Sequence, residues 1–425
     1  MILDFQPYQG QRRKLVLAFD VGTTLSSTSY CVLEPGLVPE GKDVTSFPAQ
    51  ELTSESSMIP TVLYYDTEGH VNAVGAEVLQ EGIFEQAEQE GWVKAEWFML
   101  HICPKGRENT TITQNIPPLP PGKTVVQVLA DYLFYLYNCV KSHIKNTHPN
   151  RANLGASFES HETEIVLSHP NTWDEWQQAQ MREAVALAKL ARVDDAVPEN
   201  VHLISEGEAN LWFALKHCLL PENTMEGGAR VVIVDAGRCT IDISTYQKRV
   251  GDVKFEEVSA PKCHFNGSIF VGIRARLYIE ALLKDSDYIK DLDRILRYFD
   301  QKTLLCFSND KEPEFLTFGS THDKDIRVGI RGGQLRLLGK DVAKFFEPSI
   351  ECIVSTVEEE TDGVTHVVLA GGFGSNGWLF KELQRRLGHR GLKVVRSSRN
   401  ANVSQKLIVS TLLRAECEGS TWYMQ

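Results

Sequence analysis

Three apolar runs along the chain each end at a loop that contains glycine and hydroxyl side chains. They read LVLAFDVGTT at 15–24, VVIVDAGRCT at 231–240 and HVVLAGGFGS at 366–375. Because their apolar positions are nearly continuous rather than alternating, they predict strands of a central sheet that helices cover on both faces. The first two runs share the pattern Asp-x-Gly-x-x, which predicts a duplicated α/β lobe.

Helical periodicity lies between these strands. Apolar side chains from Val125 to Ile144 recur along one face of a helix. The sequence Thr172-Trp-Asp-Glu175 is a capping-box start for a helix that runs to about residue 191, and Ser205-Glu-Gly-Glu208 is a second such start. Residues 378–387 form a third amphipathic stretch. Strands that alternate with helices indicate the α/β class.

Composition narrows the classes of partner. The chain has 425 residues, enough for two or three domains or one large two-lobed unit, and a formal charge of −12. This acidity disfavours nucleic-acid phosphates and anionic membrane surfaces as partners.

Nine cysteines without a CxxC pair argue against a disulfide framework and a zinc site. The first residues lack the order of a signal peptide and no apolar run is long enough to span a bilayer, so we expect a cytoplasmic protein.

The loop after the first apolar run carries groups that suit a phosphate and its metal. Gly22 permits a tight turn, while main-chain N–H groups and the hydroxyls of Thr23 and Thr24 can surround phosphate oxygens. Asp20 at the strand tip is placed to hold a hydrated Mg²⁺. An ordinary strand turn capped by an aspartate explains this motif about as well when it is taken alone.

The second loop presents the same groups from the other half of the chain: Asp235, Gly237, Thr240 and Asp242. Two such loops can hold a β,γ-phosphate pair and its metal from both sides, which is a site for phosphoryl transfer. The third loop, at 371–375, suits a nucleotide's ribose and base edge because glycines permit close approach. A tight turn from strand to helix is the alternative interpretation of that third loop.

These segments in this order resemble the ATPase domain of the seventy-kilodalton heat-shock chaperones, within the actin and sugar-kinase superfamily. The resemblance includes 163–191, 203–215 and 367–383 and covers about residues 14–415; 96–102 and 325–353 are similar to the divergent A-twelve-like branch. It implies an α/β protein of the actin-like ATPase fold, with two duplicated lobes whose ribonuclease-H-like sheets lie around a nucleotide cleft. We therefore expect lobe I at 1–222, with 396–425 returning to it, lobe II at 223–395, and no peptide-binding domain.

The resemblance also implies ligands and roles for individual residues. The ligands are ATP or ADP with Mg²⁺, and co-chaperone-like proteins are the implied partners. Glu206 matches the acid that, with Asp20 and Asp235, organises the attacking water and the metal's water shell; the two aspartates hold the metal through water. A helix first-turn acid is the alternative role of Glu206. The remaining matched nucleotide-binding positions are Gly22, Thr23, Thr24, Gly237, Thr240, Asp242, Asp293, Arg297, Gly371, Gly372 and Ser375.

One departure from the family concerns a lysine that points at the γ-phosphate. Met99 stands at that position, and Lys94 is the basic residue nearby. If both lay on one helix, five positions would turn Lys94 in a different direction. Loss of the cation would remove electrostatic stabilisation of the transition state, often worth several kcal/mol.

Other departures lie on the second lobe. Leu296 replaces a lysine, and Arg238 and Cys239 replace glycines. If those two positions require positive φ, each non-glycine residue costs about 1–2 kcal/mol. Arg238 could instead bind a phosphate as a fork and partly replace the missing lysine, or it could turn to solvent or pair with an acid.

The sequence thus predicts a chaperone-like ATP-binding protein with slow or impaired hydrolysis. The substitutions at Met99, Leu296 and Arg238 favour the alternative of a non-catalytic scaffold gated by nucleotide. A small-molecule kinase shares the superfamily fold, but the chaperone-like segment at 163–215 argues against it.

Overall fold

The computed structural model describes residues 6–53, 57–102, 116–148, 163–190, 200–217, 219–220, 228–250, 255–360, 362–396 and 403–418. The chain divides into two compact units. Unit 1 comprises Met1–Cys218 with Arg399–Gln425, and unit 2 comprises Leu219–Ser398. Both units are mixed α/β, as the sequence predicted.

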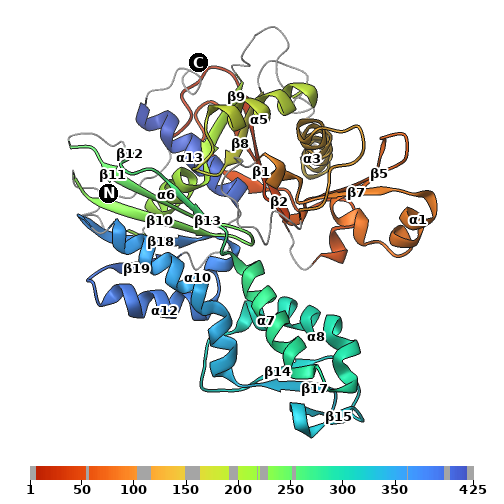
Figure 1. Ribbon diagram of the computed structural model, residues 1–425. Helices are drawn as coiled ribbons and strands as arrows, with labels where there is room; N and C mark the ends of the chain where they lie inside the picture. The colour runs from red at the N-terminus through yellow and green to blue at the C-terminus, as the bar shows by residue number, and fades with distance from the viewer. Residues whose placement is uncertain are drawn as a thin grey trace. The chain divides into compact units, whose positions relative to one another are not determined.

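Unit 1 is built on a mixed six-stranded sheet (Figure 1). Its strands are β1 (Lys14–Val21), β2 (Leu25–Leu33), β3 (Gly41–Asp43), β4 (Met58–Pro60), β8 (Thr163–His169) and β9 (Val201–Ser205). The order is β3-β2-β1-β8-β9, with β4 also paired to β2. The first three strands are antiparallel, whereas β8 and β9 extend the sheet in parallel with β1.

Helices cover both faces of this sheet, as the continuous apolar runs predicted. They are α3 (Val125–Thr147), α5 (Glu175–Leu187), α6 (Glu206–Lys216) and α13 (Val403–Glu418). Leu17 and Phe19 of β1 belong to a core that includes α3 and α5, while Val16 and Ala18 belong to a core that includes α6 and α13. Successive side chains of the strand therefore enter opposite cores.

A small antiparallel sheet completes the described part of unit 1. Its order is β6-β5-β7. The elements are β5 (Val62–Tyr65), β6 (Val71–Val74), β7 (Val93–Glu96), α1 (Ile83–Glu90) and the 3₁₀ turns η1 (Gln50–Leu52), η2 (Gly75–Leu79) and η3 (Phe98–His101).

Unit 2 repeats the strand order of unit 1 in its own six-stranded sheet. The strands are β10 (Arg230–Ala236), β11 (Ile241–Lys248), β12 (Phe255–Glu257), β13 (Lys262–His264), β18 (Val364–Ala370) and β19 (Lys393–Arg396). The order is β12-β11-β10-β18-β19, with β13 also paired to β11. The pairs β10/β11, β11/β12 and β11/β13 are antiparallel, whereas β10/β18 and β18/β19 are parallel. Both sheets thus begin with an antiparallel meander and continue with two parallel strands.

Three long helices share one core with this sheet: α7 (Ser268–Leu283), α10 (Gly339–Glu359) and α12 (Gly377–Gly388). Figure 1 shows α7 beside α8 and leading toward a smaller sheet of order β14-β17-β16-β15. The remaining elements are η5 (Asp287–Asp291), α8 (Leu292–Tyr298), the π-helical turn η6 (Phe299–Thr303), α9 (Leu304–Cys306), β14 (Glu314–Thr317), β15 (Lys324–Asp325), η7 (Ile326–Val328), β16 (Ile330–Arg331), β17 (Gln334–Leu337) and α11 (Gly371–Gly374).

The N-caps of α6 and α5 can be compared with the two helix starts predicted from the sequence. Ser205 caps α6 as predicted, because its hydroxyl accepts from the Glu208 backbone N–H at 3.2 Å. The start predicted at Thr172 is wrong: Asp174 caps α5 and Gln177 closes the capping box. The acid two residues later is the stronger cap. None of the described helices is both long and apolar enough to cross a bilayer.

Candidate functional site

In unit 1, the parallel strands bring predicted site residues to one edge of the sheet. Asp20 lies near the end of β1, and Glu206 directly follows β9. The carboxyl ends of parallel strands meet at one sheet edge, where open α/β sheets bind their ligands. Ser168 on the strand between them donates its hydroxyl to Asp20 Oδ1 at 2.6 Å. Asp20 is buried, so this bond fixes the direction of a carboxylate that bulk water barely reaches.

The turn after Asp20 requires glycine because of close approach. A Cβ on Gly22 would lie 2.6 Å from the carbonyl oxygen of Leu25. Thr23 and Thr24 are half-buried in the same turn, and the carbonyl of Thr24 accepts from the Thr61 N–H at 2.9 Å. The backbone therefore folds back on itself, and the two short hydroxyl side chains belong to the tight turn that follows Asp20.

A buried hydroxyl network lies behind this turn. The Ser26 and Thr61 hydroxyls are 2.7 Å apart, and the Tyr132 hydroxyl donates to the Pro60 carbonyl at 3.1 Å. Burial raises the pKa of Tyr132, so its hydroxyl stays a neutral donor. These contacts explain why β2 buries hydroxyl side chains and how its start is held beside Asp20.

Glu206 is the first residue of α6. The N–H of Gly207 donates to Asn171 Oδ1 at 2.7 Å, so a side chain from the end of β8 caps the same helix. The helix dipole favours a carboxylate at this position. Glu208 has a structural contact instead, since the Trp212 indole N–H lies 3.4 Å from its Oε1.

His169 is a further residue at this edge that the sequence reading did not select. It is buried, and its Nδ1 lies 2.9 Å from the Pro170 carbonyl, an oxygen that can only accept. Burial lowers the pKa of His169, with Arg182 adding to that effect. The ring is therefore neutral with its proton on Nδ1.

The expected helix that would carry both Lys94 and Met99 is wrong. Lys94 is on strand β7 and pairs with Glu96 at 2.7 Å, whereas Met99 is buried in the 3₁₀ turn η3. Trp97 between them has φ 55, which ends the strand abruptly. Met99 is a core residue here, and the ammonium of Lys94 is engaged by its neighbour.

In unit 2, Asp235 and Asp242 are direct partners across the β10/β11 hairpin. Directly opposite residues of an antiparallel pair have side chains on the same face. Both aspartates are buried. Strand β18 brings Gly371 to the same place, because Ala370 pairs with Asp235 and a Cβ on Gly371 would collide with Asp235 Oδ1 and the Ala236 carbonyl.

The loop between β10 and β11 is held by the start of α7. Gly237 N–H closes the turn on the Thr240 carbonyl at 2.9 Å. The N–H groups of Gly267, Ser268 and Ile269 then donate to the carbonyls of residues 239, 237 and 238 at 3.1, 3.2 and 2.9 Å. These first N–H groups of α7 are used by protein carbonyls and are not free for an anion.

The expected strain at the two substituted glycines is absent. Neither Arg238 nor Cys239 has a positive φ, so the backbone cost considered above does not arise. Cys239 is buried, which raises the pKa of its thiol to about 11, and it is a core residue rather than a nucleophile. Arg238 is exposed, and within the described residues its side chain has no hydrogen bond or ion pair.

The turn at Gly371–Gly374 is held by local hydrogen bonds. Gly371 has φ 81, a conformation that favours glycine. The Ser375 hydroxyl donates to the Gly372 carbonyl at 2.7 Å. Arg396, which the sequence reading missed, donates to the Ser375 carbonyl at 2.7 Å and lies 4.2 Å over the Phe380 ring.

Of the two predicted nucleotide-binding residues on α8, one already has a hydrogen-bond partner and the other is exposed. Asp293 accepts from Arg276 at 2.6 Å, while Arg297 is exposed. Leu296 is buried in the core of unit 2, which explains its apolar character.

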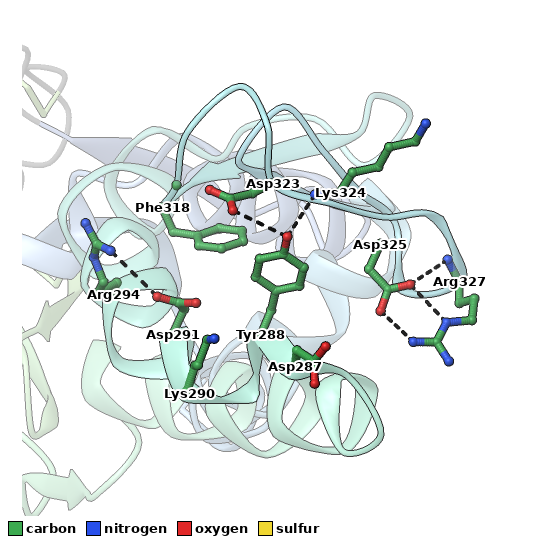
Figure 2. A pocket seen from close by; sticks show the side chains of 11 residues that line it. Asp287, Tyr288, Lys290, Asp291, Arg294, Phe318, Asp323, Lys324, Asp325 and Arg327 are labelled. Carbon is green, nitrogen blue, oxygen red and sulfur yellow. Dashed lines mark hydrogen bonds and ion pairs between the residues drawn. The ribbon is translucent and has the colours of Figure 1, made fainter.

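A hollow of about 520 Å³ lies elsewhere in unit 2 and contains none of the predicted site residues (Figure 2). Figure 2 shows the Tyr288 hydroxyl directed to Asp323 and to the backbone of Lys324, at 3.4 and 2.9 Å. Asp325 is neutralised by Arg327. Its acids and bases largely satisfy one another, so the hollow presents no dominant charge for a ligand.

Among the described residues, no group of three or more His, Cys, Asp or Glu side chains could hold a metal ion directly. Comparison with protein-family models gives no match for the chain, and comparison with curated proteins gives none either.

Proposed function

We propose that the chain binds ATP with Mg²⁺ in an actin-like ATPase fold and hydrolyses it slowly, as a chaperone-like ATPase domain. The observation that supports this most is that the two units share the same strand order and the same acid-and-glycine turn. Each has an antiparallel meander extended by two parallel strands, the order expected of ribonuclease-H-like sheets. In each, the central strand ends in a buried aspartate followed by a turn with glycine, Asp20 and Gly22 or Asp235 and Gly237.

The residues at these turns fit a nucleotide and its metal. Asp20 and Asp235 would hold Mg²⁺ through water, and the metal would neutralise phosphate charge. The short side chains around Gly22 leave backbone and hydroxyl groups for phosphate oxygens. The turn at Gly371 would receive the ribose and base edge, because hydrogen bonds from Ser375 and Arg396 already hold its backbone.

Arg238 is the cation that fits a phosphate best in unit 2. Its backbone is fixed by α7, while its side chain is exposed and has no hydrogen bond or ion pair to other described residues. A guanidinium can bind phosphate oxygens in a bidentate fork. In this proposal Glu206 orients the attacking water, and Arg238 partly replaces the lysine that Met99 displaces.

A non-catalytic scaffold gated by nucleotide is the second candidate. It is favoured by the burial of Met99 and by the ion pair that engages Lys94. Met99 is uncharged and Lys94 is paired with Glu96, so neither supplies a free cation that would stabilise charge in a phosphoryl-transfer transition state. Binding without turnover is the distinguishing property.

The test measures ATP binding by calorimetry beside phosphate release. Wild type should bind Mg-ATP and release phosphate slowly, whereas Asp235→Ala should lose most of both, because the metal's anchor is gone. Asp287→Ala, an exposed aspartate in the Figure 2 hollow, is the matched control and should behave as wild type. Binding with no release above the Asp235→Ala background would favour the scaffold, and no nucleotide binding would refute both candidates.

A further inference from the structure

Arg238 and Asp300 both lie against the N-terminal part of helix α7. The N–H of Ile269 donates to the Arg238 carbonyl at 2.9 Å. Three residues later, the position of a Cβ on Gly272 lies 2.9 Å from Asp300 Oδ1. Residues three apart on a helix lie on neighbouring turns of one face. The loop that carries Arg238 and the carboxylate of Asp300 are therefore close neighbours.

The π-helical turn η6 explains how Asp300 reaches α7. Phe299 and Thr303 of this turn are buried, which anchors it in the core of unit 2. A π turn inserts an extra residue and redirects the side chains that follow, and such turns are frequent at functional sites. Gly272 completes the arrangement, since any larger side chain there would push the carboxylate away.

The charges around Asp300 point to Arg238 as its available partner. Asp300 is exposed at the surface, but partial desolvation of its carboxyl raises its pKa, and Arg238 and Arg276 oppose that rise. Arg276 already donates to Asp293 at 2.6 Å. Arg238 has no such engagement among the described residues.

We propose that Asp300 is a positioning residue that competes with phosphate for Arg238. Without ligand, the carboxylate attracts the guanidinium beside the first two turns of α7. A phosphate must displace this attraction, so Asp300 weakens nucleotide binding and favours release. The inference rests on the proposed function, because Arg238 must meet a phosphate.

The first measurement needs no nucleotide. Carbon NMR of aspartate carboxyl groups, assigned with Asp300→Asn, would follow the titration of Asp300. Its pKa should rise in Arg238→Gln, because an attractive cation is removed, and should stay near wild type in Arg238→Lys. Lys302→Gln removes a cation from the same π turn and is the matched control.

The second measurement is the dissociation constant of Mg-ATP by calorimetry. Asp300→Asn should tighten binding about two- to fivefold, the range for an exposed charge pair. The same change in an Arg238→Gln background should have no effect, and Asp287→Asn should leave binding unchanged.

The outcomes separate the two proposals. An Asp300 pKa that does not respond to Arg238→Gln would overturn the inference, even if ATP binds. Equal tightening by Asp300→Asn with and without Arg238 would also overturn it. Failure of every variant to bind ATP would overturn the proposed function, and the competition with it, while the titration would still show whether the two side chains interact.

Discussion

The two candidate loops lie at equivalent ends of sheets with the same strand order, yet different forces hold them. In unit 1, a side chain orients the acid: Ser168 donates to Asp20 at 2.6 Å. In unit 2, the backbone packs tightly beside the acid: Asp235 lies against Gly371, where no Cβ could stand. A point mutation can therefore remove the Ser168 donor from Asp20 without moving the backbone, whereas a side chain at position 371 beside Asp235 must move it.

The two hairpin turns differ in the same way. Both turns fold back on themselves, and the unit 1 turn does so more tightly, through the approach of Gly22 to Leu25. The unit 2 turn is held from outside by three N–H groups at the start of α7. With its backbone held in this way, the unit 2 turn accommodates Arg238 and Cys239 without positive φ.

The largest expected effect is at Gly371. Gly371→Ala forces an alanine to φ 81 and drives its Cβ into the Ala236 carbonyl and the Asp235 carboxylate. We expect the free energy of unfolding to fall by about 2–4 kcal/mol in urea denaturation. Gly372→Ala is the matched control, because a Cβ there meets open space, and it should change stability by less than about 0.5 kcal/mol. Equal effects of the two changes would contradict the tight backbone packing beside Asp235.

Ser168 should come next. Ser168→Ala leaves the buried Asp20 without this donor, and a hydrogen bond to a charged group is worth about 1.5–3 kcal/mol. Denaturant unfolding and calorimetry with Mg-ATP would measure the loss of stability and of affinity. Ser168→Thr keeps the hydroxyl and should restore most of both. A stable Ser168→Ala protein with unchanged affinity would show that Asp20 needs no orienting donor.

The local parts of this picture could be predicted from the sequence. Apolar runs that end in Asp20 and Asp235 predicted buried strands with acids at their ends, and Ser205 predicted the start of α6. Each of these features, the strand ends and the helix cap, depends only on residues that are close in the sequence. Physical preferences for strand, turn and cap act within a few positions, so the sequence carries them directly.

Contacts that depend on strand register could not be predicted. Ser168 is 148 positions from Asp20, and only the parallel pairing of β1 with β8 brings them together. Likewise, the hydrogen bond from Arg396 to the Ser375 carbonyl depends on the pairing of β19 with β18 and could not be predicted. The helix expected around Lys94 and Met99 failed for a local reason, since the segment is short and Trp97 takes a left-handed conformation.

A smaller effect should separate the two turns. A Cβ on Gly22 would lie 2.6 Å from a backbone oxygen, whereas one on Gly237 would lie 3.3 Å from the Thr240 carbonyl. We expect Gly22→Ala to cost about 1–2 kcal/mol and Gly237→Ala less than about 1 kcal/mol in denaturant unfolding. A larger loss for Gly237→Ala would mean that α7 does not hold the second turn.

The smallest expected effect is a pH dependence carried by buried histidines in both units. Burial lowers the pKa of His169 in unit 1 and of His366 in unit 2, so both stay neutral in the folded chain. The unfolded chain takes up protons near pH 6.5, so the stability these residues contribute is present above that pH and is lost as the pH falls below it. Urea unfolding between pH 7.5 and pH 5.5 should therefore show a falling free energy, with a shallower slope in His169→Asn and in His366→Asn. An unchanged slope in His169→Asn would show that its imidazole is not buried as a neutral group beside Pro170.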